Sequence, residues 1–119
     1  MPHCIIEYSA PLCEITPAAT LIDAVYRAAC DSDLFDNSHI RVRATAYHDY
    51  IAGYAADNFI HVTLRILSGR SQQQKSRLTD SVRERLCGLG LSSVSVSVDI
   101  RDIDRETYAR TVIPAGSLS

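Results

Sequence analysis

The second residue of the chain is a proline, followed at once by HCIIEYS, a short run typical of a β-strand. Once Met1 is removed, Pro2 would carry a free secondary amine, and α-amines titrate near ~8. Burial beside cations disfavours the protonated amine, which would leave a base suited to moving protons at neutral pH. Met-Pro is also a common and tolerated way for a chain to begin, so the residues alone leave a catalytic and an incidental proline open.

Arg41, Arg43 and Arg70 have the chemistry to bind an acidic ligand. Arg41 and Arg43 alternate with apolar residues in IRVRATAY, which places them on one side of a predicted strand, about 6.6 Å apart. Guanidinium groups suit carboxylates, which they bind through two parallel hydrogen bonds. A salt bridge with an acid such as Asp99 explains Arg43 equally well. Arg70 precedes a predicted helix, whose N-terminal N–H groups and dipole favour an anion.

Histidines and tyrosines supply further candidates. His3 and His61 could orient a substrate or donate a proton, although a histidine in a strand is more often a hydrogen-bonded structural residue. Tyr50 could wall a pocket around a planar conjugated substrate, and core packing or a subunit contact explains it just as well. His48 and Asp49 lack further ligands at metal spacing, so we expect no metal site there.

Alternating and helical patterns predict the elements that hold these residues. The first helix has Thr16 as its expected N-cap, Pro17 at its first position and an end near Asp31. The second follows the turn at 68–71 and stops at Gly88-Leu89-Gly90, where we expect a glycine in a left-handed C-cap. Strands are expected at four places in the chain: 3–8, 40–47, 58–67 and 93–100.

This order predicts a single α/β domain over residues 1–119, built from two βαβ units. We expect a four-stranded mixed sheet with both helices on one face, packed on the alternating Ile and Val side chains. The other face would be polar and would suit water, a ligand or a neighbouring subunit. Its expected residues are Arg41, Arg43, Thr45, His61, Thr63, Arg65, Ser95 and Ser97.

Composition excludes several classes of function. A net charge of -2 and a pI of about 6.0, with basic residues spread along the chain, argue against nucleic acid as a partner. No apolar run approaches the roughly 20 residues that span a bilayer, and the first residues lack the pattern of a signal peptide. We therefore expect a cytoplasmic protein whose cysteines are buried free thiols. The cysteines are Cys4, Cys13, Cys30 and Cys87.

Several segments together resemble the 5-carboxymethyl-2-hydroxymuconate isomerase family of the tautomerase superfamily. They are MPH before an apolar strand with Glu7, the IRVR segment, the FIHVTLRI strand and the turn Gly69-Arg70-Ser71. The matching pieces run from residue 2 to about residue 71, and the order of elements matches to about residue 103. Any one of these segments alone would mean little.

The resemblance implies a homotrimer, with the polar faces of its sheets turned inward and active sites at subunit contacts. It also implies that Met1 is removed, that Pro2 is the general base, and that Arg41 and Arg70 bind and polarise an acidic substrate. Arg43, His3 and Tyr50 are then candidates for substrate binding. No metal or organic cofactor is expected.

The expected activity is isomerisation of an unsaturated 2-hydroxy carboxylate, such as 5-carboxymethyl-2-hydroxymuconate, to its conjugated keto isomer. The family places this reaction in 4-hydroxyphenylacetate breakdown. Two alternatives stay open: a general keto-enol tautomerase with other substrates, and a non-catalytic oligomeric protein that binds a small anion.

Overall fold

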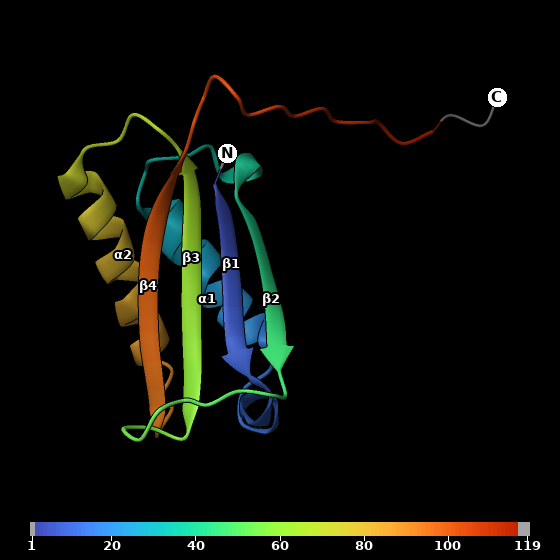
Figure 1. The fold of residues 1–119 in the computed structure, drawn as a ribbon. Helices are drawn as coiled ribbons and strands as arrows, with labels where there is room; N and C mark the ends of the chain where they lie inside the picture. Colours follow the sequence, from blue (N-terminus) through green and yellow to red (C-terminus); the bar gives the residue numbers. More distant parts are fainter. Residues whose placement is uncertain (1, 117–119) are drawn as a thin grey trace.

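The computed structural model describes residues 2–116, which form a four-stranded sheet with two helices on one face (Figure 1). Short 3-10 helices follow the first strand and precede the second. In chain order the elements are β1 (His3–Ser9), η1 (Ala10–Glu14), α1 (Ala18–Asp31), η2 (Asn37–His39), β2 (Arg41–Tyr47), β3 (Asn58–Leu67), α2 (Gln72–Cys87) and β4 (Val94–Ile103).

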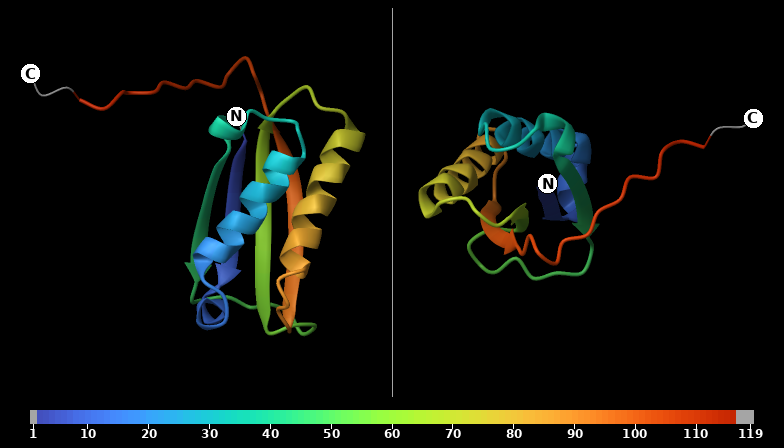
Figure 2. Two further views of the ribbon diagram at one scale, coloured as in Figure 1. Left: turned by 180° about the vertical axis from the view of Figure 1, so that it is seen from behind. Right: turned by 90° about the horizontal axis from the view of Figure 1, so that it is seen from above.

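The sheet consists of two βαβ units joined edge to edge. Its strand order is β2-β1-β3-β4; β1 pairs with β2 and β3 with β4 in parallel, whereas the central strands β1 and β3 are antiparallel. Both helices lie behind the same face (Figure 2). The predicted fold class is therefore confirmed, and the opposite face of the sheet is left open within this chain.

The hydrophobic core fills the space between the helices and the two central strands. Leu78, Val82 and Leu86 follow one another at i, i+4 and i+8 along α2, and each is at most 2% exposed. On β3 every second residue from Ile60 to Ile66 faces the same core. Because strand side chains alternate, the residues between them are directed to the open face.

The predicted start of α1 is wrong in detail. Pro17, rather than Thr16, is the N-cap of α1, and no side chain caps this end. The backbone N–H of Thr16 instead bonds to the carbonyl of Leu12, which closes the turn of η1 and buries Thr16. At the end of α2, Gly88 has a helical φ of -75° and Gly90 takes the left-handed conformation at +76°.

Two further predictions need correction. Cys4 is buried, and burial raises the pKa of its thiol to about 12, but Cys13 and Cys87 are exposed. Cys13 lies in the η1 turn, and Cys87 follows the core residue Leu86 and so faces away from the core. The last strand also extends to Ile103, beyond the predicted end at residue 100.

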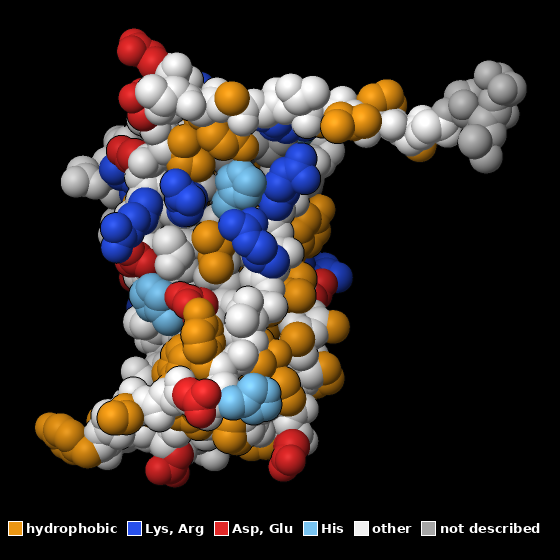
Figure 3. All heavy atoms as spheres, turned by 45° about the vertical axis from the view of Figure 1, so that its right-hand side comes forward, with side chains coloured by type: hydrophobic (Ala, Val, Ile, Leu, Met, Phe, Trp, Pro, Cys, Tyr) orange, Lys and Arg blue, Asp and Glu red, His pale blue; other side chains and the backbone are white. Residues whose placement is uncertain are grey.

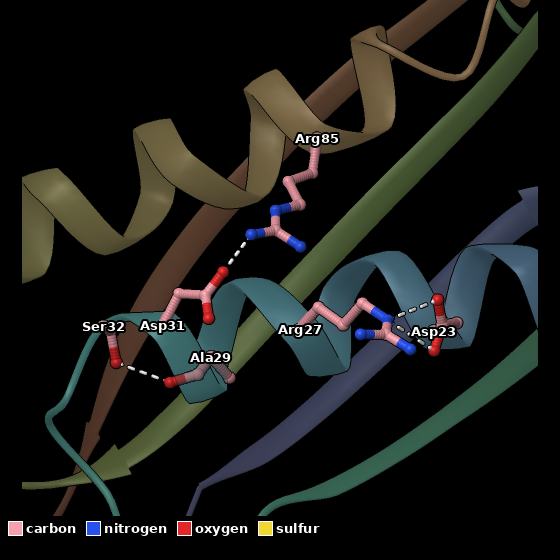
Figure 4. A network of polar contacts seen from close by, with 6 residues as sticks. All are labelled: Asp23, Arg27, Ala29, Asp31, Ser32 and Arg85. Carbon is pink, nitrogen blue, oxygen red and sulfur yellow. Dashed lines mark hydrogen bonds and ion pairs between the residues drawn. The ribbon is translucent and has the colours of Figure 1, made fainter.

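The helices are joined to each other by charged side chains as well as by the core. Arg85 of α2 donates to Asp31 at the end of α1, and Arg27 pairs with Asp23 within α1 (Figure 4). These side chains are largely solvent-exposed, so each pair contributes little to stability. No helix in the described part of the chain is long and apolar enough to cross a membrane.

Candidate active site

The open face of the sheet carries a row of cationic side chains at the end where β1 begins. His3 lies between Arg41 of β2 and Arg65 of β3, because both are its partners in the strand register. Arg101 of β4 continues the row beside Arg65. Directly opposite residues point to the same face of a sheet. Figure 3 shows the basic side chains gathered around a histidine below the C-terminal tail.

The hydrogen bonds of His3 define its tautomer. A guanidinium only donates, so Nη1 of Arg43 donates to Nδ1 of His3 across 3.3 Å. The proton then lies on Nε2, which donates to the hydroxyl of Tyr108 at 2.9 Å. The two rings meet edge to face, 6.1 Å between centroids. In this arrangement His3 is neutral and holds the segment after β4 against the open face.

Electrostatics agree with the neutral tautomer. Partial burial lowers the pKa of His3 most, and the positive charges of Arg43, Arg41 and Arg65 lower it further. The ion pairs found among residues 2–116 use none of these arginines, so their charges meet no carboxylate of those residues. The end of the face around His3 is a region of uncompensated positive potential, which favours an anion.

Pro2 is the residue before His3, at the start of β1. Its side chain is less than 2% exposed, and its carbonyl accepts the backbone N–H of Arg41 at 3.1 Å. The strand register therefore ties Pro2 to the strand that carries two of the arginines. Met1 lies outside the described residues, so its removal stays a prediction.

Arg70 lies at the same end of the sheet, but its side chain reaches a different partner. Its Nη2 donates to the carbonyl of Leu34 at 2.5 Å, and its guanidinium lies over the ring of Phe35, 5.3 Å from the centroid. Arg70 precedes Ser71, which caps α2 through a reciprocal capping box with Gln74, as the predicted helix start requires. In this chain Arg70 thus joins the turn before α2 to the segment after α1.

Tyr50 lies at the opposite end of the sheet from His3. Strand β2 runs from Arg41, beside His3, to Tyr47, beside Ser9, a distance of about 20 Å. Tyr50 follows β2 and packs edge to face on Phe59, 5.4 Å between centroids. It lines a hollow of about 740 Å³ beneath the segment between β2 and β3. Within one chain, therefore, Tyr50 is not brought together with Pro2.

On the open face, polar groups farther along the strands from His3 are paired with one another. His61 Nδ1 lies 2.6 Å from the hydroxyl of Ser97, and its Nε2 lies 3.0 Å from Asp99. Asp99 also accepts from Arg101. Although partial burial works against it, the hydrogen bonds from Arg101 and His61 lower the pKa of Asp99. His61 is a hydrogen-bonded strand histidine, and Asp99 is not the partner of Arg43 in this chain.

Sequence reasoning did not select two residues that the structure places at this site. Tyr108 contacts His3 across 105 positions of sequence, and nothing in the sequence around either residue signals that contact. Arg65 was expected only as one of the polar-face residues. Its position beside His3 depends on the register of β1 against β3, which alternation alone does not determine. Among residues 2–116 no cluster of three acidic, cysteine or histidine side chains could hold a metal ion.

Solved structures define the class of fold. The chain matches a 5-carboxymethyl-2-hydroxymuconate delta-isomerase with a TM-score of 0.78 at 19% identity, covering 94% of this chain and 88% of that one. A 5-carboxymethyl-2-hydroxymuconate isomerase from Deinococcus radiodurans R1 matches with a TM-score of 0.74 at 21% identity, covering 92% of this chain and 88% of that one. A fused 4-OT symmetric trimer matches with a TM-score of 0.70 at 14% identity, covering 87% of this chain and 88% of that one. The fold is that of the tautomerase superfamily.

A family model narrows this assignment. The model described as 5-carboxymethyl-2-hydroxymuconate isomerase matches residues 2–113, nearly the whole chain. The protein belongs to that family and is an enzyme of the isomerase type. A search of curated protein sequences found no match.

Proposed function

We propose that the protein isomerises an unsaturated 2-hydroxy carboxylate, of which 5-carboxymethyl-2-hydroxymuconate is the type, to its conjugated keto isomer. The observation that carries this proposal is the buried Pro2 at the head of a strand, directly before His3, whose neighbouring arginines no carboxylate of the described chain neutralises. The family match supports the reaction class. No metal or organic cofactor takes part in the proposed reaction.

The proposed base is the imino nitrogen of Pro2, freed by removal of Met1. Burial and nearby positive charge both disfavour a protonated amine, so the nitrogen is available to accept a proton. It takes the proton of the substrate's 2-hydroxyl group and returns one to carbon, so that the enol becomes a ketone conjugated with the remaining double bond. Arg41 holds a carboxylate and stabilises the negative charge of the dienolate between the two proton transfers.

Arg43 and His3 complete the proposed binding surface on this chain. Arg43 extends the positive charge of Arg41 along β2, and a substrate with several carboxylates needs more than one guanidinium. Neutral His3 separates the arginines and fixes Tyr108. With its pKa lowered by burial and by those arginines, His3 orients groups at neutral pH rather than donating a proton.

Arg70 and Tyr50 enter the proposed site in different ways. Arg70 must exchange its bond to the Leu34 carbonyl for a substrate carboxylate, a movement within the same end of the sheet. Tyr50 lies at the other end, so it would reach a substrate only from a neighbouring subunit. A homotrimer supplies such a neighbour, and one solved relative of the fold is a symmetric trimer. We place the assembly in the cytoplasm, with a small carboxylate as its ligand.

Replacement of Pro2 by alanine tests the mechanism. General base catalysis contributes roughly 10²- to 10⁴-fold, so Pro2→Ala should lower kcat by about that factor when the loss of the dienol is followed by ultraviolet absorbance. Pro11→Ala is the matched control, since Pro11 is an exposed proline in η1 at the far end of the sheet. Equal turnover in the two variants would remove Pro2 from the mechanism.

Substrate range separates the remaining alternatives. A general keto-enol tautomerase would turn over monoacid enols such as phenylpyruvate and show no preference for a triacid. A non-catalytic anion-binding protein would bind carboxylates to the same cationic face and turn over neither. A panel of 2-hydroxydienoate acids followed by absorbance distinguishes all three outcomes.

A further inference from the structure

Arg65 lies on the far side of His3 from Arg41. Both arginines are direct partners of His3 in the strand register, one on β3 and the other on β2. Their Cα atoms are thus two strand spacings apart, about 10 Å, with both side chains on the open face. Long, flexible arginine stems can close this span around a ligand that carries a carboxylate at each end.

The charge of Arg65 has no partner in the described chain. Its side chain is exposed, and no ion pair or side-chain hydrogen bond of Arg65 is found among residues 2–116. The residue beside it on β4 is another arginine, Arg101, and like charges directly opposite each other destabilise a sheet. Arg101 differs in one respect, because Asp99 accepts a hydrogen bond from it at 3.1 Å.

The groups around Arg65 do not compensate its charge within the described chain. His3 provides no compensation, since it is neutral and both its ring nitrogens are engaged by Arg43 and Tyr108. Besides burial, the positive charges of Arg43, Arg41 and Arg65 all act on His3 and lower its pKa. The pair of opposed arginines, Arg65 and Arg101, weakens the sheet, and no contact of Arg65 among residues 2–116 offsets this cost. Such a local cost is typical of a binding site.

We propose that Arg65 binds the second carboxylate of the substrate, while Arg41 and Arg43 bind the first, so that this end of the sheet selects dicarboxylates over monocarboxylates. This inference rests on the proposed function and deepens it. Arg65 is the residue that sets the charge preference, because it stands apart from the β2 arginines on the other side of His3. A guanidinium suits this role, since it forms two parallel hydrogen bonds to one carboxylate.

Binding of an inert ligand tests the inference without turnover. Titration calorimetry with hexanedioate and with hexanoate measures the preference for the dianion as a ratio of the two affinities. Arg65→Gln should lower this ratio roughly tenfold, which corresponds to the loss of one charge-assisted contact. Arg65→Lys, which keeps the charge but not the paired geometry, should recover part of the loss.

Arg101→Gln is the matched control, because it removes the neighbouring arginine of the same row, which Asp99 already partners. The inference is overturned if both glutamine variants lower the ratio equally, or if neither lowers it. Unchanged circular dichroism and thermal midpoint show that each variant is folded. The outcome is separate from that of Pro2→Ala: a reduced ratio in Arg65→Gln with full turnover in Pro2→Ala would retain the dianion site and reject the proline mechanism.

Discussion

The two ends of the open sheet face differ in how their polar groups are satisfied. Around His3 the arginines of β2 and β3 meet no carboxylate of the described chain. Farther along the same strands, His61 is held by Ser97 and Asp99, and Glu7 accepts from Tyr47. Both ends belong to the same regular sheet, so the backbone does not explain the difference. The unpaired charge is the basis of the proposed ligand site, whereas the paired groups at the other end stabilise the fold.

Of the substitutions that compare the two ends, the one with the larger expected effect lies at the unpaired end. Arg41→Ala should lower kcat/KM by roughly tenfold to a hundredfold, because a hydrogen bond between charged groups is lost to solvent. A rise in KM alone would show that Arg41 binds substrate and transition state equally; an equal fall in kcat and kcat/KM would show a contact made only in the transition state. Steady-state kinetics with a dicarboxylate enol measures both constants. If neither kcat nor KM changed, Arg41 would not belong to the site.

A smaller effect is expected at the paired end, and on stability instead of turnover. Asp99→Asn weakens the contacts to His61 and Arg101, which are partly exposed, so the free energy of unfolding should fall by about 1 kcal/mol or less. Urea denaturation followed by circular dichroism measures this change. Turnover should stay at the level of the unmodified protein. A loss of activity as large as that of Arg41→Ala would abolish the distinction between the two ends.

The smallest effect concerns the pH dependence of stability. Burial and the charges of Arg43, Arg41 and Arg65 lower the pKa of His3 in the folded state, so the unfolded chain binds more protons below ~6.5. Stability from His3 is therefore present above pH ~6.5 and is lost as the pH falls toward the lowered folded pKa. The Tyr108 hydroxyl also faces this ring.

His3→Gln removes the titrating group and keeps a polar side chain. Its free energy of unfolding, measured between pH 5 and 7 by urea titration, should vary less with pH than that of the unmodified protein. The comparison is made as a difference between the two proteins, since the other three histidines are present in both. Parallel curves would show that His3 keeps its ordinary pKa and that the cationic end does not act on it.

Most of the fold follows from local patterns. Each strand and helix buries one side against a single layer, so its own sequence shows the pattern. Examples are the alternation in the strands and the i, i+4, i+8 spacing of Leu78, Val82 and Leu86. The helix ends were harder to predict. Whether Thr16 or Pro17 caps α1 depends on the preceding η1 turn, which takes up the backbone N–H of Thr16.

In the candidate site, only the neighbours that lie on one strand were predictable. Arg41 and Arg43 share β2, so alternation alone placed them together on the polar face. Arg65 and Tyr108 come beside His3 through long-range pairing, for which neighbouring residues give no signal. The side-chain bonds of Arg70 to the segment after α1 belong to the same class of contact. Register and tertiary contacts thus decide which members of the polar face form a site.

The state of the Pro2 nitrogen tests the central claim most directly. Two forms of the protein are compared, one with Met1 retained and one starting at Pro2, each identified by its intact mass and assayed with the same dienol. The form that has lost the mass of one methionine residue should carry the turnover, and the form in which Pro2 is acylated by Met1 should be inactive. Equal turnover in the two forms would contradict a mechanism in which this nitrogen is the base.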